Sequence, residues 1–297
     1  MTVFTAILRT MRPRQWPKNL LFVFPALVFD GQLFVLDSFL RVLTAACLLI
    51  LMSGAVYIMN DLVDVEKDRL HPRKKFRPIA AGTLPVPAAK AATFCLPILS
   101  IVAALTFSVS LAWVLVLYLV LQVAYSFYLK HVPIVDVLAV TAGFVLRVIA
   151  GVVVISVQNF SPWLYACTGL LALFLVVGKR RQELIALGED AAQTRPIFAH
   201  YNLALLDEML RFVITSTFLT YLLYTIEVNI TPVKDVNLLL LTVPLVLYGL
   251  MRYMYLIHIK GEGAAPEEVL LTDRPIQITV LMWFTTVVFV LYILPRL

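Results

Sequence analysis

Long apolar runs separated by short polar segments dominate this chain of 297 residues. A helix of about 20 apolar residues is long enough to cross the hydrocarbon core of a bilayer. Nine such helices are predicted, near residues 19–36, 38–60, 89–108, 111–129, 133–155, 162–182, 209–228, 236–258 and 276–295. The first is the least regular, because Pro25 interrupts it and Asp30 with Gly31 ends it. The pattern predicts an all-α, polytopic membrane protein with nine transmembrane helices, organised as one domain over residues 1–297.

Composition and charge agree with this prediction and orient the helices. Hydrophobic residues make up 61% of the chain and charged residues 14%, which excludes a soluble domain. If the N-terminus is cytoplasmic, all but four of the 24 Lys and Arg lie in or beside the inner segments 1–18, 61–88, 130–132, 183–208 and 259–275. The net charge of +6 is therefore a topology signal, and no nucleic-acid partner is predicted.

The strongest candidate for chemistry is the polar stretch 60–69, NDLVDVEKDR, at the end of the second predicted helix. Asp61, Asp64 and Asp68 are three and four residues apart, which predicts that they share one face of a helix. Clustered carboxylates at the end of an apolar run are costly unless a hard divalent cation relieves their repulsion. We expect these three catalytic aspartates, assisted by Asn60, to bind Mg²⁺ together with waters and substrate phosphate oxygens. A solvated acidic helix end is the alternative.

Two basic inner segments supply candidate phosphate ligands. One is HPRKKFRP at 71–78, directly after the aspartates, and the other is MRPRQWPKN at 11–19. The second segment is expected to grip a lipid phosphate, although an interfacial anchor with a tryptophan at headgroup depth is the alternative. The substrate-binding candidates from these regions are Arg14, Lys18, Asn19, Asn60, Arg69, Lys75 and Arg77.

Polar residues near the inner ends of later helices complete the candidate site. Arg147 is predicted to lie within the bilayer, where a lone cation is costly, and it shares a helix face with Asp136. These two residues either face a polar cavity or form a purely structural ion pair. Glu183 follows Lys179 by four residues, on the same face, which topology alone does not explain. The candidates here are Tyr125, Tyr128, Lys130, Arg147, Lys179, Arg180 and Glu183. Asp273 and Arg274 are expected to be solvated loop charges, and a position toward the cavity is the alternative.

The motif Asn-Asp-x-x-Asp-x-x-x-Asp after the second of nine helices resembles the first signature of the UbiA superfamily of intramembrane prenyltransferases. The resemblance covers essentially the whole chain. MRPRQWPKN, NDLVDVEKDRLHPRKKFRPIAAG, and YSFYLKH followed by GKRRQEL resemble one branch in particular, the decaprenyl-phosphate phosphoribosyltransferases. The resemblance implies nine helices around a central cavity in the cell membrane, with Mg²⁺-bound pyrophosphate at the cytoplasmic end.

One departure from the superfamily bears on the substrate. A second Asp-x-x-x-Asp motif is expected after the sixth helix, and this chain has Lys179-Arg180-Arg181-Gln182-Glu183 there. Cations bind phosphate directly, which suits a donor with a second, separate phosphate. The branch resemblance thus implies Mg²⁺-dependent transfer of a 5-phosphoribosyl group from phosphoribosyl pyrophosphate to a polyprenyl (decaprenyl) phosphate. Pyrophosphate is released, and the product is a precursor of lipid-linked arabinose for cell-wall arabinan.

Two other functions are weighed against this one. A UbiA-type prenyltransferase that uses a prenyl diphosphate and an aromatic or other acceptor is disfavoured by the missing second motif. A lipid-phosphate transporter is disfavoured because the charge is concentrated at the cytoplasmic ends of the helices rather than at mid-membrane. The oligomeric state stays open, with a homo-oligomer as one alternative.

Overall fold

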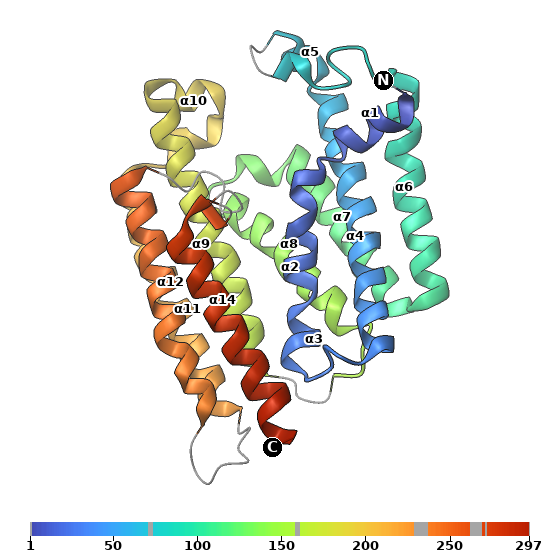
Figure 1. Ribbon diagram of the computed structural model, residues 1–297. Coiled ribbons are helices and arrows are strands. Elements are labelled where there is room, and N and C mark those ends of the chain that lie inside the picture. The colour runs from blue at the N-terminus through green and yellow to red at the C-terminus, as the bar shows by residue number, and fades with distance from the viewer. Residues whose placement is uncertain are drawn as a thin grey trace. The chain divides into compact units, whose positions relative to one another are not determined.

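The computed structural model describes residues 2–70, 74–157, 161–228, 237–261, 269–270 and 272–296. Within these ranges the chain consists of helices joined by turns and loops, with no strand (Figure 1). Eight helices in the described residues are long and apolar enough to cross a membrane. The prediction of an all-α, polytopic membrane protein is confirmed. The chain forms two compact units, Met1–Phe127 with Leu146–Val157 (unit 1) and Tyr128–Val145 with Gln158–Leu297 (unit 2).

Unit 1 is built around one long helix. Its helices are α1 (Val3–Thr10), α2 (Trp16–Val23), α3 (Pro25–Phe29), α4 (Leu36–Val63), α5 (Val65–Leu70), α6 (Val86–Phe107), α7 (Val109–Phe127) and the end of α8 (Val135–Val152). The central helix α4 packs against α2, α6 and α7, and buries Leu49 and Met52 in their shared core. Gly151 of α8 lies so close to α2 that a Cβ there would be 2.0 Å from the Val23 carbonyl oxygen. Only glycine permits this approach.

The first predicted span, 19–36, is not one continuous helix. It is divided into α2 and α3 at Phe24 and Pro25, and α3 ends at Phe29. Pro25 has no N–H for a helical hydrogen bond, and Gly31 turns the chain with a φ of 74°. This broken segment, added to the eight long helices, is consistent with the nine predicted spans.

Unit 2 pairs its helices two by two. It contains the start of α8, then α9 (Pro162–Leu187), α10 (Ala191–Thr194), α11 (Leu203–Glu227), α12 (Val243–Tyr255) and α14 (Arg274–Val288). Helix α9 packs along α11, and α12 packs along α14. Their core includes Phe174, Leu206, Leu210 and Tyr253.

A π turn, Leu256–Lys260, extends α12 and joins it to α9. The Ile257 carbonyl oxygen accepts hydrogen bonds from Gln182 Nε2 at 2.8 Å and Arg181 Nη1 at 3.4 Å. A π turn changes the backbone hydrogen-bonding register, so that carbonyls become available to other partners. The contact fixes the end of α9 that carries the basic segment KRRQE.

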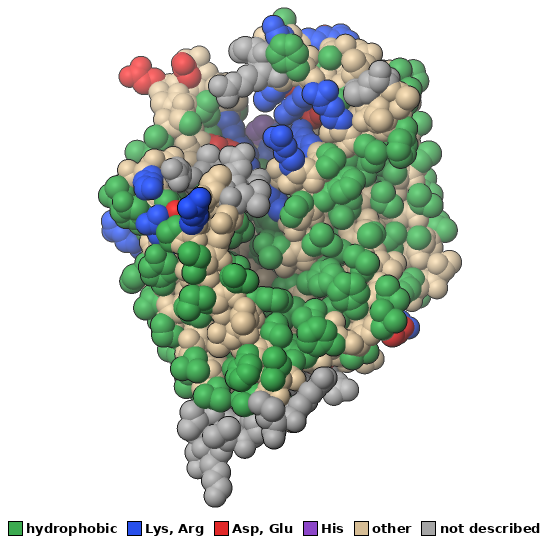
Figure 2. Space-filling model, viewed as in Figure 1, with side chains coloured by type: hydrophobic (Ala, Val, Ile, Leu, Met, Phe, Trp, Pro, Cys, Tyr) green, Lys and Arg blue, Asp and Glu red, His purple; other side chains and the backbone are tan. Residues whose placement is uncertain are grey.

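Exposed apolar side chains cover the lengths of the helices, as expected for surfaces that face lipid. Phe94, Trp113 and Phe212 are each about 70% exposed. On the face seen in Figure 2, Lys and Arg of unit 1 gather at the end where α1 and α5 lie, and apolar side chains cover the helices below. The candidate chemistry of unit 1 is at this polar end.

Candidate active site

The aspartate segment 60–69 is interrupted rather than continuous. Helix α4 ends at Val63, Asp64 adopts φ −93° and ψ 7°, and α5 begins at Val65. The prediction of one uninterrupted helix is therefore wrong in detail. Backbone hydrogen bonds nevertheless span the break, from Asp64 N–H to Asn60 O (3.0 Å) and from Asp68 N–H to Asp64 O (2.8 Å).

Asp61 and Asp68, about two helical turns apart in the sequence, both form ion pairs with Arg77. Both carboxylates are buried, with 3% and 2% of each residue exposed. Arg77 Nη1 lies 2.7 Å from Asp68 Oδ2 and 3.1 Å from Asp61 Oδ1. Arg12 Nη2 lies 2.7 Å from the same Asp61 Oδ1. Two buried carboxylates are costly unless they are paired, and these guanidinium groups provide the pairing.

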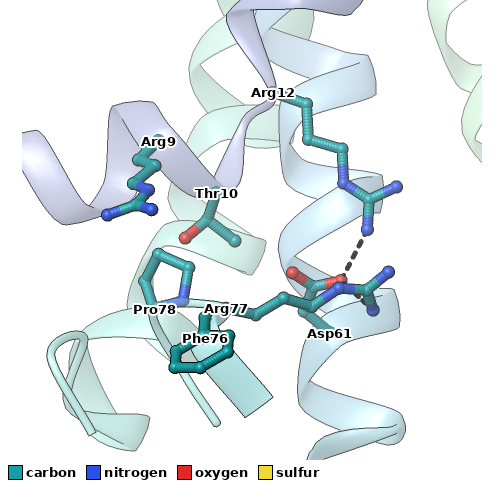
Figure 3. A pocket seen from close by; sticks show the side chains of 7 residues that line it. All are labelled: Arg9, Thr10, Arg12, Asp61, Phe76, Arg77 and Pro78. Carbon is teal, nitrogen blue, oxygen red and sulfur yellow. Dashed lines mark hydrogen bonds and ion pairs between the residues drawn. The ribbon is translucent and has the colours of Figure 1, made fainter. Parts of the chain in front are cut away.

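A pocket of about 260 Å³ opens beside this cluster, which we call the aspartate pocket. Its lining consists of Arg9, Thr10, Arg12, Asp61, Phe76, Arg77 and Pro78. Figure 3 shows Arg12 and Arg77 converging on Asp61, while Arg9 and Thr10 of α1 lie on the other side. Three arginines and one carboxylate make the lining net positive, which favours an anion.

The other predicted residues of the aspartate motif lie outside this cluster of ion pairs. Asn60 and Asp64 are half-buried, and Asp64 forms no side-chain hydrogen bond or ion pair with another described residue. Arg69 is exposed and pairs with Glu66 at 2.9 Å.

The predicted basic segment 71–78 also has members inside and outside this cluster of ion pairs. Lys75 is exposed, and its ammonium lies 5.3 Å from the centre of the Phe76 ring. Residues 71–73 lie outside the described part of the chain. Arg77, at the other end of the segment, pairs with both buried aspartates.

A divalent cation beside the aspartate pocket would need Asp68 as well as Asp61, because Asp61 is the single carboxylate of a lining that also holds three arginines. Asp61 and Asp68 supply two buried carboxylates that already share one positively charged group. Mg²⁺ in proteins commonly takes one or two carboxylates and completes its shell with waters and phosphate oxygens. Among the described residues, no three His, Cys, Asp or Glu side chains are grouped closely enough to hold a metal by themselves. A cation on Asp61 and Asp68 would need further ligands, such as waters or phosphate oxygens.

Asn19 and Arg147 meet in the core of unit 1. Arg147 Nε donates to Asn19 Oδ1 at 2.7 Å, and its Nη2 donates to the Tyr118 hydroxyl at 2.8 Å. Asn19 Nδ2 donates in turn to Ser53 Oγ at 3.2 Å. Asn19 is 3% exposed and Arg147 is 8% exposed. Arg147 is thus held by hydrogen bonds to Asn19 of α2 and Tyr118 of α7.

The other residues of the N-terminal motif are nearer to solvent. Arg14 is exposed and Lys18 is half-buried. Trp16 Nε1 donates to the Met11 carbonyl oxygen at 3.3 Å, which ties the motif to the end of α1. Asn19 is thus separated from Arg14 and Lys18 by burial, although all three were predicted to bind one lipid phosphate.

In unit 2, Asp136 and Arg180 form the centre of a buried ion-pair network. Arg180 Nε lies 2.9 Å from Asp136 Oδ2, and its Nη1 lies 2.8 Å from Glu183 Oε2. Arg195 Nη1 reaches the same Glu183 oxygen at 3.1 Å. Asp136 is fully buried, and Arg180 is 4% exposed. The ion pair considered between Asp136 and Arg147 is not formed, because Asp136 pairs with Arg180 instead.

Tyr201 completes this network. Its hydroxyl donates to Asp136 Oδ1 at 2.6 Å and accepts from the backbone N–H of Ile134 at 2.8 Å. Ile134 has a φ of 67°, which is strained for a β-branched residue, so the tyrosine stabilises an unusual turn before α8. Burial, and next the hydrogen bond to Asp136, raises the pKa of Tyr201 to about 12.

The remaining unit 2 candidates lie closer to the surface. Lys179 is exposed, and it forms no ion pair with a described residue, because Glu183 turns to Arg180 and Arg195 instead. Tyr128 is exposed and Lys130 is half-buried, as is Tyr125 of unit 1.

Asp273 corrects another prediction, because it is buried rather than solvated. Its side chain accepts from the Ile276 backbone N–H at 3.0 Å, as the N-cap of α14, and pairs with Arg252 at 2.8 Å. The hydrogen bond from Arg252 lowers the pKa of Asp273. An aspartate just before a helix with Pro275 in its first turn was the available signal for a cap.

Sequence reasoning missed several residues of these networks. Arg12 lies inside the motif MRPRQWPKN but was not selected, since nothing in the local spacing connects it to Asp61. Arg9, Arg195 and Tyr201 carried no local signal either. The partners of Arg195 and Tyr201 lie on other elements of the fold, and Arg9 is brought to the pocket by α1.

Comparison with known proteins identifies the family. The pattern of the UbiA prenyltransferase family matches residues 19–271. The chain therefore belongs to the UbiA prenyltransferase family. A UbiA homologue from Archaeoglobus fulgidus, solved with DMAPP and Mg²⁺, has a similar fold, with a TM-score of 0.69 over 97% of this chain and 99% of that chain. The identity of 18% makes this a likeness of fold alone.

Two curated relatives are more similar in sequence. The decaprenyl-phosphate phosphoribosyltransferase of Corynebacterium glutamicum is 32% identical, over 97% of this chain and 87% of the relative. The protein of the same name from Mycobacterium tuberculosis is 32% identical, over 95% of this chain and 92% of the relative. The similarity extends over nearly the full length of each protein.

Proposed function

We propose that this protein transfers a 5-phosphoribosyl group from phosphoribosyl pyrophosphate to a polyprenyl phosphate such as decaprenyl phosphate. The reaction releases pyrophosphate, requires Mg²⁺, and takes place at the cytoplasmic face of the cell membrane. The observation that carries the proposal is the nearly full-length similarity to relatives of that name. The product would feed lipid-linked arabinose for cell-wall arabinan.

The aspartate pocket supports the leaving-group side of this reaction. In the transfer, an oxygen of the acceptor phosphate forms a bond to C1 of the ribose. The bond from C1 to the pyrophosphate oxygen breaks, and the pyrophosphate leaves with the electron pair. Bound to Asp61 and Asp68, with Asn60 and Asp64 nearby, Mg²⁺ would supply charge neutralisation for the pyrophosphate. Arg77 and Arg12 would bind further phosphate oxygens.

The acceptor needs positioning more than activation. A phosphate monoester is already anionic at neutral pH, so no strong general base is required. Arg14 and Lys18 are the accessible cations of the N-terminal motif, and we assign them to the acceptor phosphate. Asn19 and Arg147 would act behind them, because Arg147 holds Asn19 and so fixes α2. The hydrocarbon tail would extend into the bilayer.

The donor's second phosphate is assigned to unit 2. Lys179 is the exposed cation of the segment KRRQE, and phosphate oxygens are suitable partners for it. Arg180 and Glu183 bond each other, and Arg180 also bonds Asp136, so we assign them to positioning Lys179. Tyr125, Tyr128, Lys130, Arg69 and Lys75 remain candidates for substrate contacts.

The test is direct. Purified protein is incubated with labelled phosphoribosyl pyrophosphate and a series of polyprenyl phosphates, with and without Mg²⁺. We expect a labelled lipid phosphate only when Mg²⁺ and both substrates are present. A prenyl diphosphate offered as the donor should give no product. Transfer of a prenyl group, or movement of lipid phosphate across liposomes without any product, would contradict the proposal.

A further inference from the structure

We propose that helix α1 is an in-plane membrane anchor. It lies in the boundary between the headgroups and the acyl chains of the leaflet at the polar end of unit 1. Its partner is the lipid surface, which it contacts through four neighbouring apolar side chains that we call the α1 strip: Val3, Phe4, Ile7 and Leu8. Neither the placement of α1 nor its test uses the proposed reaction, so the two proposals stand or fall separately.

Two sides of α1 have different surroundings. Successive residues of an α-helix are rotated by about 100°, so residues four apart lie on the same side. Ala6 and Thr10 form the side that faces the protein, since they are 0% and 1% exposed. Thr5 and Arg9 form a second side, which is polar and exposed. The helix thus has one side for the protein core and one side for water.

The α1 strip is the third side. Phe4 is 69% exposed and Val3 is 47% exposed, whereas Ile7 and Leu8 are half-buried against the core that contains Ala6. Single exposed apolar residues are common on protein surfaces, but neighbouring ones on one side of a helix indicate an apolar partner. A helix with a protein side, a water side and an apolar side suits the boundary of a membrane.

Contacts with α6 fix the depth of α1. Ala6 belongs to the same buried cluster as Ala89 and Ala92, which lie in the first two turns of α6. The following turns of this membrane-spanning helix carry Phe94 and Ile98, 69% and 60% exposed on the surface that faces lipid. Figure 1 shows α1 crossing the ends of α4 and α6 instead of running along them. The α1 strip therefore lies at the edge of the apolar surface of unit 1.

The charge of the N-terminal segment favours a lipid surface over a protein partner. No acidic residue precedes Asp30 in the sequence, whereas four cations follow or end α1: Arg9, Arg12, Arg14 and Lys18. Basic amphipathic helices bind membranes by burying apolar area and by attraction to anionic headgroups. A strip of two helical turns is also small beside the roughly 800 Å² that each partner buries in a stable protein interface.

The anchor bears on the aspartate pocket because α1 ends there. Arg9 and Thr10, in the last turn of α1, line the pocket (Figure 3). A helix that lies in the plane of the leaflet therefore sets this pocket beside the lipid headgroups.

The experiment measures the surroundings of α1 and not turnover. A nitroxide label is attached to Phe4→Cys or Thr5→Cys, in the full chain with its three native cysteines replaced by alanine, and the protein is placed in nanodiscs of phosphatidylcholine and phosphatidylglycerol. Relaxation by oxygen, which concentrates in lipid, is compared with relaxation by a water-soluble nickel complex. We expect oxygen to dominate for Phe4→Cys, at a depth of about 5–10 Å, and the nickel complex to dominate for Thr5→Cys.

Phe94→Cys is the matched control, because Phe94 is as exposed as Phe4 and lies on a membrane-spanning helix. Its label should also be relaxed mainly by oxygen. Dominant relaxation by the nickel complex in Phe4→Cys would overturn the proposal, because the α1 strip would then face water. Weak relaxation by both reagents would overturn it as well, because a second copy of the chain or another protein would then cover the strip.

A second measurement keeps the native cysteines. Phe4→Trp and Thr5→Trp are prepared in the otherwise unchanged chain, and tryptophan emission is recorded in nanodiscs with and without brominated phosphatidylcholine, which quenches nearby indoles. The four native tryptophans are common to both variants, so the difference in quenching reports on the added one. We expect stronger quenching in Phe4→Trp than in Thr5→Trp. Equal quenching would contradict the in-plane anchor.

Discussion

Units 1 and 2 both pair arginines with buried carboxylates, but the balance of charge differs. In unit 1, Arg12 and Arg77 are partly exposed on a pocket that Arg9 also lines. In unit 2, Arg180 and Asp136 are enclosed. With Glu183 and Arg195 the network holds two arginines and two carboxylates, so its charges balance. An open cluster with excess positive charge suits the binding of anions. A charge-balanced cluster with an enclosed Arg180–Asp136 pair suits the positioning of helices.

The largest effect is expected from Asp68→Asn in unit 1. Asparagine keeps the shape of the side chain but removes the charge that the metal requires, so turnover should fall about 100-fold or more. The labelled-lipid assay measures turnover, and size-exclusion chromatography checks that the protein is folded. Asp64→Asn should act in the same direction if Asp64 also contributes to the metal site. A near-normal rate for Asp68→Asn at ordinary Mg²⁺ would contradict the metal assignment of Asp68.

The next effect is expected in unit 2 and concerns stability. Arg180→Ala leaves Asp136 buried with one partner fewer, a loss of about 3–5 kcal/mol for a broken buried pair. Thermal unfolding in detergent measures this loss. Arg211→Ala, which breaks an exposed pair with Glu208, is the control and should change stability by less than about 1 kcal/mol.

Lys179→Ala tests whether unit 2 also has an exposed cation that binds the donor. Lys179 is exposed beside Arg180, so its removal should weaken phosphoribosyl pyrophosphate binding without loss of stability. Affinity for the lipid acceptor should change much less. Equal losses for both substrates would show that this segment shapes the protein generally instead of binding the donor.

A smaller effect is expected for the acceptor. Lys18→Ala removes one charge-assisted contact, worth about 1.5–3 kcal/mol, and should raise the KM for lipid roughly ten- to a hundredfold. The KM for the donor should stay near the wild-type value. Lys90→Ala, which removes an exposed lysine of α6, is the control. Unchanged lipid kinetics in Lys18→Ala would favour the interfacial anchor.

The smallest effect is a dependence of unit 2 stability on alkaline pH. Burial raises the pKa of Tyr201 to about 12, from 10 in the unfolded chain. Between pH 10 and 12 the unfolded state loses this proton before the folded state does, so stability falls as the pH rises through that range. Thermal unfolding of the wild type should show this decline, on the order of 1–2 kcal/mol. Tyr201→Phe should show a smaller decline, and identical curves would exclude Tyr201 as its source.

The sequence by itself determined the membrane-spanning helices and the place of the candidate chemistry. The apolar runs predict the spans because their length matches the thickness of a bilayer, and α4, α9 and α11 lie where the runs do. The motif around Asp61 and Asp68 could also be located from the sequence, although the break at Asp64 and the pairing of both carboxylates with Arg77 could not.

Only the tertiary structure decided which charges meet. Arg12 reaches Asp61 across 49 residues, and Arg180 reaches Asp136 across 44. A charge is a property of one residue, but its partner depends on how helices pack, and packing is set by the apolar surfaces of many residues together. The same reason explains why Arg180 and Glu183, close to Lys179 in sequence, form an ion pair with each other, whereas Lys179 forms none with a described residue. Burial, which only the fold creates, separates the groups that hold the protein in place from those left to bind a substrate.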